Sequence, residues 1–331
     1  MEKIDFVIIW VDGNDPSWQD SYKKYRPEQE NESASVIRFR DWDNLKYWFR
    51  GVEKFAPWVN KIYFVTCGHY PEWLNKEAPK LYCVKHEDYM PAELLPTFSS
   101  HPIELNLHRI KGLSDRFVYF NDDTFITRPM APGRFFRDGL PCDMAICETF
   151  YPQKGMMPHI LLNNIACINR HFDKKEVLKK NRKKWLTLAY GGKLVNTLRM
   201  LPHRQFSAFF DPHLPNSYLK QTFEEVWEVF DDELTSTSHT RFRSVNDVNQ
   251  YLFRYWQLVS GNFSPMNTSK DAKFYEVAED TIDDIENHIR QQDVEMLVLN
   301  DSAKIEHFDE LKRRVCEAFE EILPQKSSFE L

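Results

Sequence analysis

Two short acidic stretches directly follow apolar runs, and their residue types are the ones in this chain best suited to chemistry. The run at residues 4–10 leads into DGND (12–15), and the run at 116–120 leads into NDD (121–123). If both runs are parallel strands of one sheet, the acidic stretches lie at its carboxyl edge, where such sheets bind ligands. Paired aspartates there suit a divalent metal ion that shares its coordination with substrate phosphates. Aspartates that only cap turns are the alternative, and the sequence leaves it open.

Arginines occur in three groups that suit phosphate, because the guanidinium fork matches phosphate oxygens. The groups are Arg38 with Arg40, Arg50 alone, and Arg241 with Arg243. The last pair precedes a helix start expected at Ser244, with Asp247 three residues further on, which favours an anion site. Asn44 and Arg50 fall outside the apolar stripe of a helix expected at 41–57, so we expect both to face a ligand. For any one of these arginines, a surface salt bridge is the alternative.

His213 stands in FFDPHLPNSYLK (209–220), between two prolines. A rigid loop of this kind can present an imidazole as a general base, since the ordinary pKa of histidine is near 6.5. Most isolated histidines are structural, and that alternative stays open. His101 and His108 flank Glu104 at helical spacing, and we expect them on a helix surface.

Six cysteines without tight spacing are typical of reduced thiols. Cys67 with His69 and Cys83 with His86 would supply four zinc ligands. Their spacing departs from that of zinc fingers, and both cysteines fall at expected strand ends, where cysteine packs as a small apolar residue. Core packing is therefore favoured over zinc.

Alternating strands and helices are expected to position these side chains. Strands are expected at 4–10, 61–66, 82–85 and 116–120, with helices at 41–57 and 103–110. This alternation is typical of an α/β fold with a Rossmann-like, doubly wound, mostly parallel sheet. Later helices are expected at 223–234, 245–260, 280–292 and 308–323, with a strand at 296–299. We divide the chain into an α/β half (1–150), a helical, basic insertion with the His213 loop (151–240) and a C-terminal segment that completes the site (241–331).

Composition limits the classes of function. The 331 residues are 42% hydrophobic, 15% aromatic and 28% charged, as in a folded domain. The chain has only 10 glycines and neither a GxGxxG nor a P-loop motif, which excludes a plain dinucleotide or P-loop site. A net charge of −7 argues against general binding of nucleic acid. No stretch approaches the roughly 18 apolar residues of a membrane span, so we expect a cytoplasmic protein.

The segment 172–188 is an exception to the acidic character of the chain. It carries seven Lys or Arg residues between Lys174 and Lys184, and Trp185, Leu186 and Leu188 follow them. This mixture predicts a peripheral contact with the inner face of the cell membrane, or with an anionic acceptor. A solvated helix face is the alternative.

Several longer strings resemble the conserved regions of the Stealth proteins. IDFVIIWVDGNDPSW (4–18) is similar to the first region. Two strings resemble the second region, namely RFRDWDNLKYWFRGVEKFAPWVNKIYFVTCGHYPEWLN (38–75) and LPTFSSHPIELNLHRIKGLSDRFVYFNDDTFI (95–126). FDPHLPNSYLK through RFRSVNDVN (210–249) resembles the third region, and LVLNDS (297–302) with FEEILPQKSSFE (319–330) resembles the fourth.

Stealth proteins are sugar-1-phosphate transferases, which in bacteria build phosphodiester-linked capsule or cell-wall polysaccharides. A related animal enzyme is N-acetylglucosamine-1-phosphotransferase. The resemblance implies a nucleotide-sugar donor, with a UDP-linked sugar expected, and Mg²⁺ or Mn²⁺. It implies transfer of hexose-1-phosphate to a hydroxyl of a glycan acceptor, on a lipid carrier by our expectation, with release of a nucleoside monophosphate.

The resemblance also implies roles for single residues. The donor-binding loop would contain Asp12, Gly13, Asn14 and Asp15, and further donor contacts would come from Arg40, Asn44, Arg50 and Asp247, with Arg241 beside them. Asp122 and Asp123 would bind the metal or the transferred phosphate directly, and Asn300 and Asp301, assigned as further metal ligands, would close over the site. His213 would deprotonate the acceptor hydroxyl, with Asp123 and Arg243 as its catalytic partners.

Two other classes of function remain open on sequence grounds. A metal-dependent glycosyltransferase would use a similar sheet and similar acidic residues but would release a nucleoside diphosphate. A non-catalytic carbohydrate-binding protein would account for the aromatic content. The chain also departs from the Stealth pattern at Ser99, where asparagine is expected; if that side chain touches the donor, contacts change while the chemistry does not.

Overall fold

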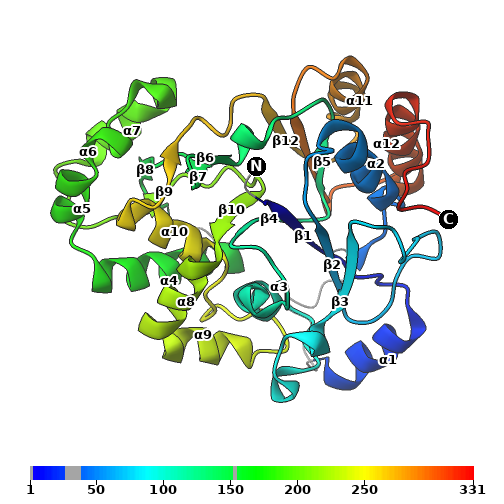
Figure 1. The fold of residues 1–331 in the computed structure, drawn as a ribbon, viewed down its shortest axis with the longest axis horizontal. Helices are drawn as coiled ribbons and strands as arrows, with labels where there is room; N and C mark the ends of the chain where they lie inside the picture. The colour runs from blue at the N-terminus through cyan, green and yellow to red at the C-terminus, as the bar shows by residue number, and fades with distance from the viewer. Residues whose placement is uncertain (1–2, 27–38, 152–154) are drawn as a thin grey trace.

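A five-stranded sheet forms the centre of the computed structural model, which describes residues 3–26, 39–151 and 155–331. Its strand order is β10 (Asn216–Leu219), β4 (Arg116–Phe120), β1 (Asp5–Ile9), β2 (Ile62–Thr66) and β3 (Leu81–Lys85). The strands β4, β1, β2 and β3 are parallel, and β10 is an antiparallel edge strand. The expected Rossmann-like, mostly parallel sheet is confirmed (Figure 1).

Helices cover both faces of the sheet because successive residues of its strands point to opposite sides. On one face, Phe6 and Ile8 of β1 pack with α2 (Leu45–Phe55), α11 (Ile282–Gln291) and α12 (Phe308–Ile322). On the other face, Val7 packs in a core with α3, α4, α8 and α10. Those helices span Ser100–Leu105, Met156–His171, Lys220–Val229 and Tyr251–Ser260. Continuous apolar strands, buried on both faces, are typical of such parallel sheets.

A second, three-stranded sheet joins the C-terminal segment to the first half of the chain. Its order is β12 (Ala272–Glu276), β13 (Met296–Asn300) and β5 (Thr124–Ile126). The strand β13 runs antiparallel to β5, and the Leu299 amide donates a 2.8 Å hydrogen bond to the backbone oxygen of Asp123. The end of β13 therefore lies directly beside the acidic stretch that follows β4.

Short elements complete the fold. The remaining strands are β6 (Phe136–Arg137), β7 (Leu140–Asp143), β8 (Cys147–Glu148), β9 (Ala208–Phe209) and β11 (Ser264–Pro265). The remaining helices are α1 (Pro16–Tyr25), α5 (Lys174–Lys180), α6 (Arg182–Trp185), α7 (Leu194–Met200) and α9 (Asp231–Ser238), with the 3₁₀ segments η3 (His86–Asp88) and η7 (Leu188–Lys193) among the connections. The helices α5, α6 and α7 lie at the end of the molecule opposite α12 (Figure 1).

Four expected helices differ from the structure. In place of the helix expected at 103–110, α3 ends at Leu105 and a separate 3₁₀ segment spans Leu107–Arg109. The helix expected at 41–57 begins at Leu45, after Asn44, and ends at Phe55. The helix expected at 223–234 is two helices, α8 and α9, because the backbone of buried Phe230 leaves helical geometry between them. The helix expected at 245–260 begins only at Tyr251, since the Asp247 carboxylate accepts the Ser244 amide and holds a turn before it.

His86 gives stability a pH dependence. Its imidazole is buried, and this burial lowers its pKa to about 4. Between pH 4 and 6.5 the unfolded chain binds this proton and the folded chain does not, so stability falls as the pH drops below about 6.5. From pH 7 to pH 5 we expect His86 to remove about 2 kcal/mol from the free energy of unfolding. Urea unfolding at several pH values measures this dependence. His86→Asn should flatten the slope of the free energy of unfolding against pH, whereas His239→Gln, at an exposed histidine, should keep it. An unchanged slope in His86→Asn contradicts the assignment.

Candidate active site

Asp123 and His213 meet at the carboxyl edge of the central sheet. Asp123 follows β4, and His213 lies in the loop between β9 and β10, with its Nε2 3.3 Å from Asp123 Oδ2. A carboxylate only accepts hydrogen bonds, so this contact requires a proton on Nε2 and leaves the lone pair on Nδ1. The His213 backbone has φ +48°, a conformation uncommon outside glycine that the flanking loop holds in place. The ring of Phe274 on β12 packs edge-on against the imidazole at 5.5 Å.

The electrostatics of the neighbouring carboxylates of Asp122 and Asp123 favour a cation beside them. Desolvation, and next the charge of Asp123, raise the pKa of the Asp122 carboxyl well above its usual value, although its side chain reaches solvent. The two neighbouring carboxylates thus resist carrying two negative charges at once. For His213, burial lowers the pKa, but the hydrogen bond and the charge of Asp123 outweigh it, so the pKa is raised.

Asp122, Asp123 and Asn300 are the oxygen-bearing side chains at this edge that could contribute to a divalent metal site. Asp122 and Asp123 offer adjacent carboxylates, and Asn300 ends the neighbouring strand. Within the part of the chain that the structure describes, no group of three or more His, Cys, Asp or Glu has metal-binding geometry. One or two carboxylates completed by substrate phosphates are the usual environment of Mg²⁺. The same finding makes the zinc alternative at Cys67, His69, Cys83 and His86 wrong.

The buried pair of His101 and Asp247 positions the turn that carries Arg243. His101 Nδ1 lies 2.9 Å from Asp247 Oδ2, and both side chains are almost fully buried. The sequence led us to expect that Asp247 contacts the nucleotide-sugar donor, but this carboxylate is already occupied. It holds the turn that carries Arg243, whose guanidinium donates a hydrogen bond to the Ser100 hydroxyl at 2.9 Å. The expected surface position of His101 is wrong, because α3 packs against α9 and encloses it.

Glu104, on the same helix, was not predicted as a site residue. One of its carboxylate oxygens accepts the Tyr119 hydroxyl at 3.2 Å, and the other is buried with no hydrogen-bond partner. Its charge also contributes to the raised pKa of His213. A buried glutamate in an amphipathic helix, flanked by two histidines, is the signal that could have identified it.

The loop after β1 is held rigidly. The Asp12 amide donates to His69 Nε2 at 2.7 Å, and Asp12 Oδ1 accepts the Asn14 amide. Asp15 caps α1 by accepting the Trp18 amide at 2.7 Å. Gly13 has no room for a side chain, because a Cβ would lie 2.2 Å from the Phe39 carbonyl oxygen. Asn14 is exposed and able to meet a ligand. His69, which follows β2, supports this loop through its bond to Asp12, a role that the sequence did not identify.

Arg40 and Asp301 bring the C-terminal segment over the first half of the chain. Arg40 Nε donates to Asp301 Oδ2 at 2.9 Å, its NH2 group contacts the other carboxylate oxygen, and the guanidinium stacks over the Phe308 ring. Because Arg40 occupies both oxygens, Asp301 closes the segment and is not the free metal ligand expected from sequence. Arg38, expected beside Arg40, lies outside the described residues.

Arg50 was expected to face a ligand, and this is wrong. Its side chain is 6% exposed and binds Glu330 through Nε and NH2, both at 2.8 Å, with Glu320 and the Leu323 carbonyl on NH1. Arg50 thus anchors the C-terminal tail. Arg241 stacks over the Tyr25 ring at 4.6 Å, and the half-buried Asn44 precedes α2 without a side-chain cap.

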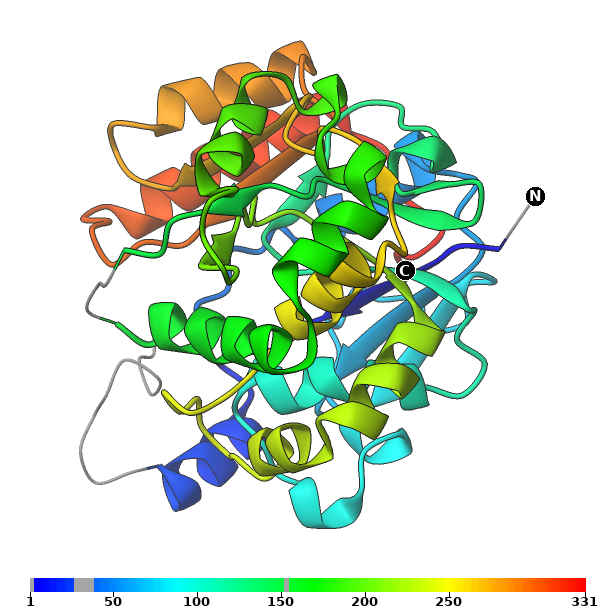
Figure 2. The ribbon, with the colours of Figure 1, turned by 90° about the vertical axis from the view of Figure 1, so that its left-hand side faces the viewer.

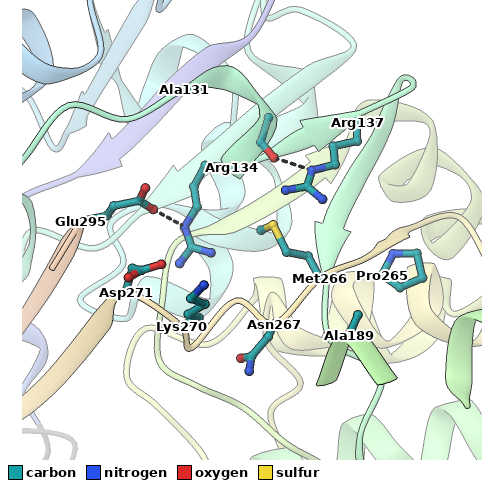
Figure 3. A pocket seen from close by; sticks show the side chains of 11 residues that line it. Ala131, Arg134, Arg137, Ala189, Pro265, Met266, Asn267, Lys270, Asp271 and Glu295 are labelled. Atoms are coloured by element: carbon teal, nitrogen blue, oxygen red, sulfur yellow. Dashed lines mark hydrogen bonds and ion pairs between the residues drawn. The ribbon is translucent and has the colours of Figure 1, made fainter. Parts of the chain in front are cut away.

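A pocket of about 450 Å³ lies at the far end of the second sheet from Asn300. Figure 3 shows Arg134, Arg137 and Lys270 around it, with Ala189 of η7 on the side away from Glu295. Arg134 pairs with Glu295 at 3.3 Å, and Arg137 donates to the Gly133 carbonyl at 3.0 Å. The segment of residues 266–271 leads from this pocket into β12, which carries Phe274 to His213.

The comparisons with known proteins agree with this arrangement. Models of the Stealth proteins match the chain at residues 2–30 (conserved region 1), 38–142 (conserved region 2) and 212–256 (conserved region 3). The chain belongs to the Stealth family. These regions contain the loop after β1, the Asp122–Asp123 stretch, and the segment from His213 to Arg254. The assignment of the fourth region to 297–330 stays a prediction.

Named relatives align along the whole chain. Over 332 residues, all of this chain and 98% of the relative, it is 43% identical to a capsular polysaccharide phosphotransferase WcwK of Streptococcus pneumoniae. Over 99% of this chain and 96% of the relative, it is 40% identical to the exopolysaccharide phosphotransferase cps2G of Lactiplantibacillus plantarum. It is 38% identical, over the full length of both, to the receptor polysaccharide phosphotransferase WefC of Streptococcus gordonii. The expectation of a phosphotransferase enzyme is confirmed.

Breaking the Arg50 anchor should destabilise the fold. Arg50→Met leaves Glu330, itself 4% exposed, as an unpaired buried charge, so we expect about 3–5 kcal/mol less free energy of unfolding. Arg50→Met with Glu330→Met removes both charges and recovers much of the loss. Denaturant unfolding measures both variants, with Arg313→Met, which breaks an exposed pair to Glu317, as the control. An Arg50→Met protein as stable as the wild type contradicts the anchoring role.

Proposed function

We propose that this Stealth protein transfers hexose-1-phosphate from a nucleotide sugar, with UDP as the nucleotide, to a hydroxyl of a glycan acceptor in the synthesis of a capsular or extracellular polysaccharide. The observation that carries the proposal is the contact of His213 with Asp123 at the carboxyl edge of the sheet. Family membership and full-length relatives named as polysaccharide phosphotransferases support the reaction class.

His213 acts as the general base. Asp123 accepts a hydrogen bond from the Nε2–H group of His213 and so orients the ring. Nδ1 is then left to take the proton of the acceptor hydroxyl. The acceptor oxygen forms a bond to the phosphorus that carries the sugar, and the bond from this phosphorus to the bridging oxygen of the diphosphate breaks. The nucleoside monophosphate leaves with that electron pair, and the bond between the sugar and its phosphate stays intact.

Arg243 neutralises the charge that builds on the transferred phosphoryl group. Its bond to Ser100 and the turn held by Asp247 and His101 fix the guanidinium, and its charge acts on His213. Phosphoryl transfer depends mainly on such positioning and charge stabilisation. His101 and Asp247 are therefore positioning residues in this proposal.

The donor lies against the loop after β1, with Asn14 and the backbone of Gly13 facing it. Asp122 and Asp123, completed by Asn300, hold Mg²⁺ or Mn²⁺, which when bound neutralises the diphosphate. The acceptor approaches from β12, where Phe274 is 45% exposed beside His213 and offers an aromatic face to a sugar. The pocket of Arg134, Arg137 and Lys270 lies further along that path.

Removal of the imidazole tests the general base. His213→Gln should lower kcat by about 10²–10⁴-fold, the usual contribution of a general base, with little change in stability because the side chain is 39% exposed. Transfer assays with a panel of nucleotide sugars, together with thermal unfolding, measure both effects. His239→Gln, at an exposed histidine, is the matched control. Near-normal turnover in His213→Gln would contradict the role.

The metal is tested separately. We expect chelation to abolish transfer and Mg²⁺ or Mn²⁺ to restore it. Asp122→Asn should raise the metal concentration that gives half-maximal activity by about 10-fold or more. Asp309→Asn, in the first turn of α12, is the control. Transfer that persists in chelator would remove the metal from the proposal while leaving the role of His213 intact.

A further inference from the structure

The segment 174–204, here called the basic lobe, contains α5, α6, η7 and α7 and forms one end of the molecule. Figure 2 shows these helices from the side that faces away from α12 and the C-terminus. Trp185 and Tyr190 are fully buried beneath it, and Lys174 extends inward to the Met200 carbonyl at 2.6 Å. The expectation that Trp185 faces outward is therefore wrong, since it belongs to the core that supports the lobe.

The outer side of the basic lobe carries apolar side chains that its core does not use. Leu188 is 89% exposed, and Leu198, Val195 and Leu201 are 47%, 44% and 40% exposed. Val195 and Leu198 are three residues apart on α7, so they share one helix face. Between Leu188 and α7, Gly191 and Gly192 have open space around them, with nothing within 4 Å of an added Cβ. Four large apolar residues are thus exposed within fourteen positions of this lobe, here called the apolar patch, and exposed apolar surface of this kind marks interaction sites.

The same segment is strongly basic. Residues 172–204 carry ten Lys or Arg and two Asp or Glu, in a chain whose net charge is −7. The exposed cations are Lys175, Lys179, Lys180, Arg182, Lys183, Arg199 and Arg204. Exposed leucines within a basic surface match a bilayer that contains anionic lipid, where the leucines enter the boundary of the acyl chains and the cations meet the headgroups.

We propose that the basic lobe docks the enzyme on an anionic membrane surface through Leu188, Val195, Leu198 and Leu201. Among the described residues no helix is long and apolar enough to cross a membrane, so this contact is peripheral. Ala189, next to Leu188, lines the pocket that also contains Arg134 and Lys270 (Figure 3). Docking through Leu188 therefore brings the rim of this pocket to the membrane. There the pocket meets the head of a lipid-linked acceptor, and this contact with the acceptor alone rests on the proposed function.

Vesicle sedimentation of the full chain tests docking without turnover. We expect binding to vesicles of phosphatidylglycerol and phosphatidylcholine, weakened by salt, and little binding to pure phosphatidylcholine. The triple variant Leu188→Gln, Leu198→Gln, Leu201→Gln should lose at least 10-fold in the partition coefficient. The variant Lys179→Glu, Lys180→Glu, Lys183→Glu should lose on the order of 100-fold.

The matched control is Tyr82→Gln with Val229→Gln, which removes two exposed apolar side chains outside the basic lobe and should leave vesicle binding unchanged. Circular dichroism and thermal unfolding check that all variants fold. Equal binding to neutral and anionic vesicles, or triple-variant binding at the wild-type level, overturns the proposal. The proposal is also overturned if the wild-type chain is a dimer that binds no vesicles and the triple variant is a monomer. The apolar patch would then join two copies of the chain. Transfer to a soluble acceptor reports on the proposed reaction independently of these results.

Discussion

The junction at Asp123 is the constraint on which the rest of the site depends. Its backbone oxygen accepts the Leu299 amide and so joins the second sheet to the central one, while its side chain binds His213. Two segments far apart in sequence thus meet on one residue. A shift of β13 against β5 would separate Asn300 from Asp123, because the pairing of Met296 with Ile126 and of Val298 with Thr124 fixes their relative positions. The site is therefore as rigid as the pairing of β13 with β5.

The C-terminal segment is held in place by charge pairs that span most of the chain. Arg40 binds Asp301, and Arg50 binds Glu330 and Glu320, each across more than 260 positions. The pair of Arg50 with Glu330 is buried and costs desolvation, so its net contribution to stability is small when intact but the loss of one partner is expensive. The pairs of Arg40 with Asp301 and of Arg50 with Glu320 are partly exposed. Their geometric specificity fixes where α12 and the tail lie against α2. Arg40 and Arg50, which the sequence suggested as phosphate ligands, thus orient the protein's own carboxylates.

Sequence patterns predicted β1, β2, β3 and β4 of the central sheet and β13 of the second sheet, because continuous apolar runs leave few alternatives, but they did not predict β5, β10 or β12. They also predicted the two loops at the carboxyl edge, since the ends of parallel strands meet there. The sequence could not show that Arg50, Asp247 and Asp301 already have partners, because those partners lie hundreds of residues away or on another helix. For the same reason His101 was assigned to a helix surface: local spacing does not reveal that α9 covers α3. The division of the chain at residues 150 and 240 stays a prediction.

The central claim is that phosphorus, and not the anomeric carbon, is attacked. The most direct test uses a nucleotide sugar with ¹⁸O in the bridge between the anomeric carbon and phosphorus, and follows label and nucleotide by mass spectrometry. The account predicts a nucleoside monophosphate without label and an acceptor product that carries both the label and a new phosphodiester. A labelled nucleoside diphosphate with an unphosphorylated glycosidic product would contradict it and would make the chain a glycosyltransferase.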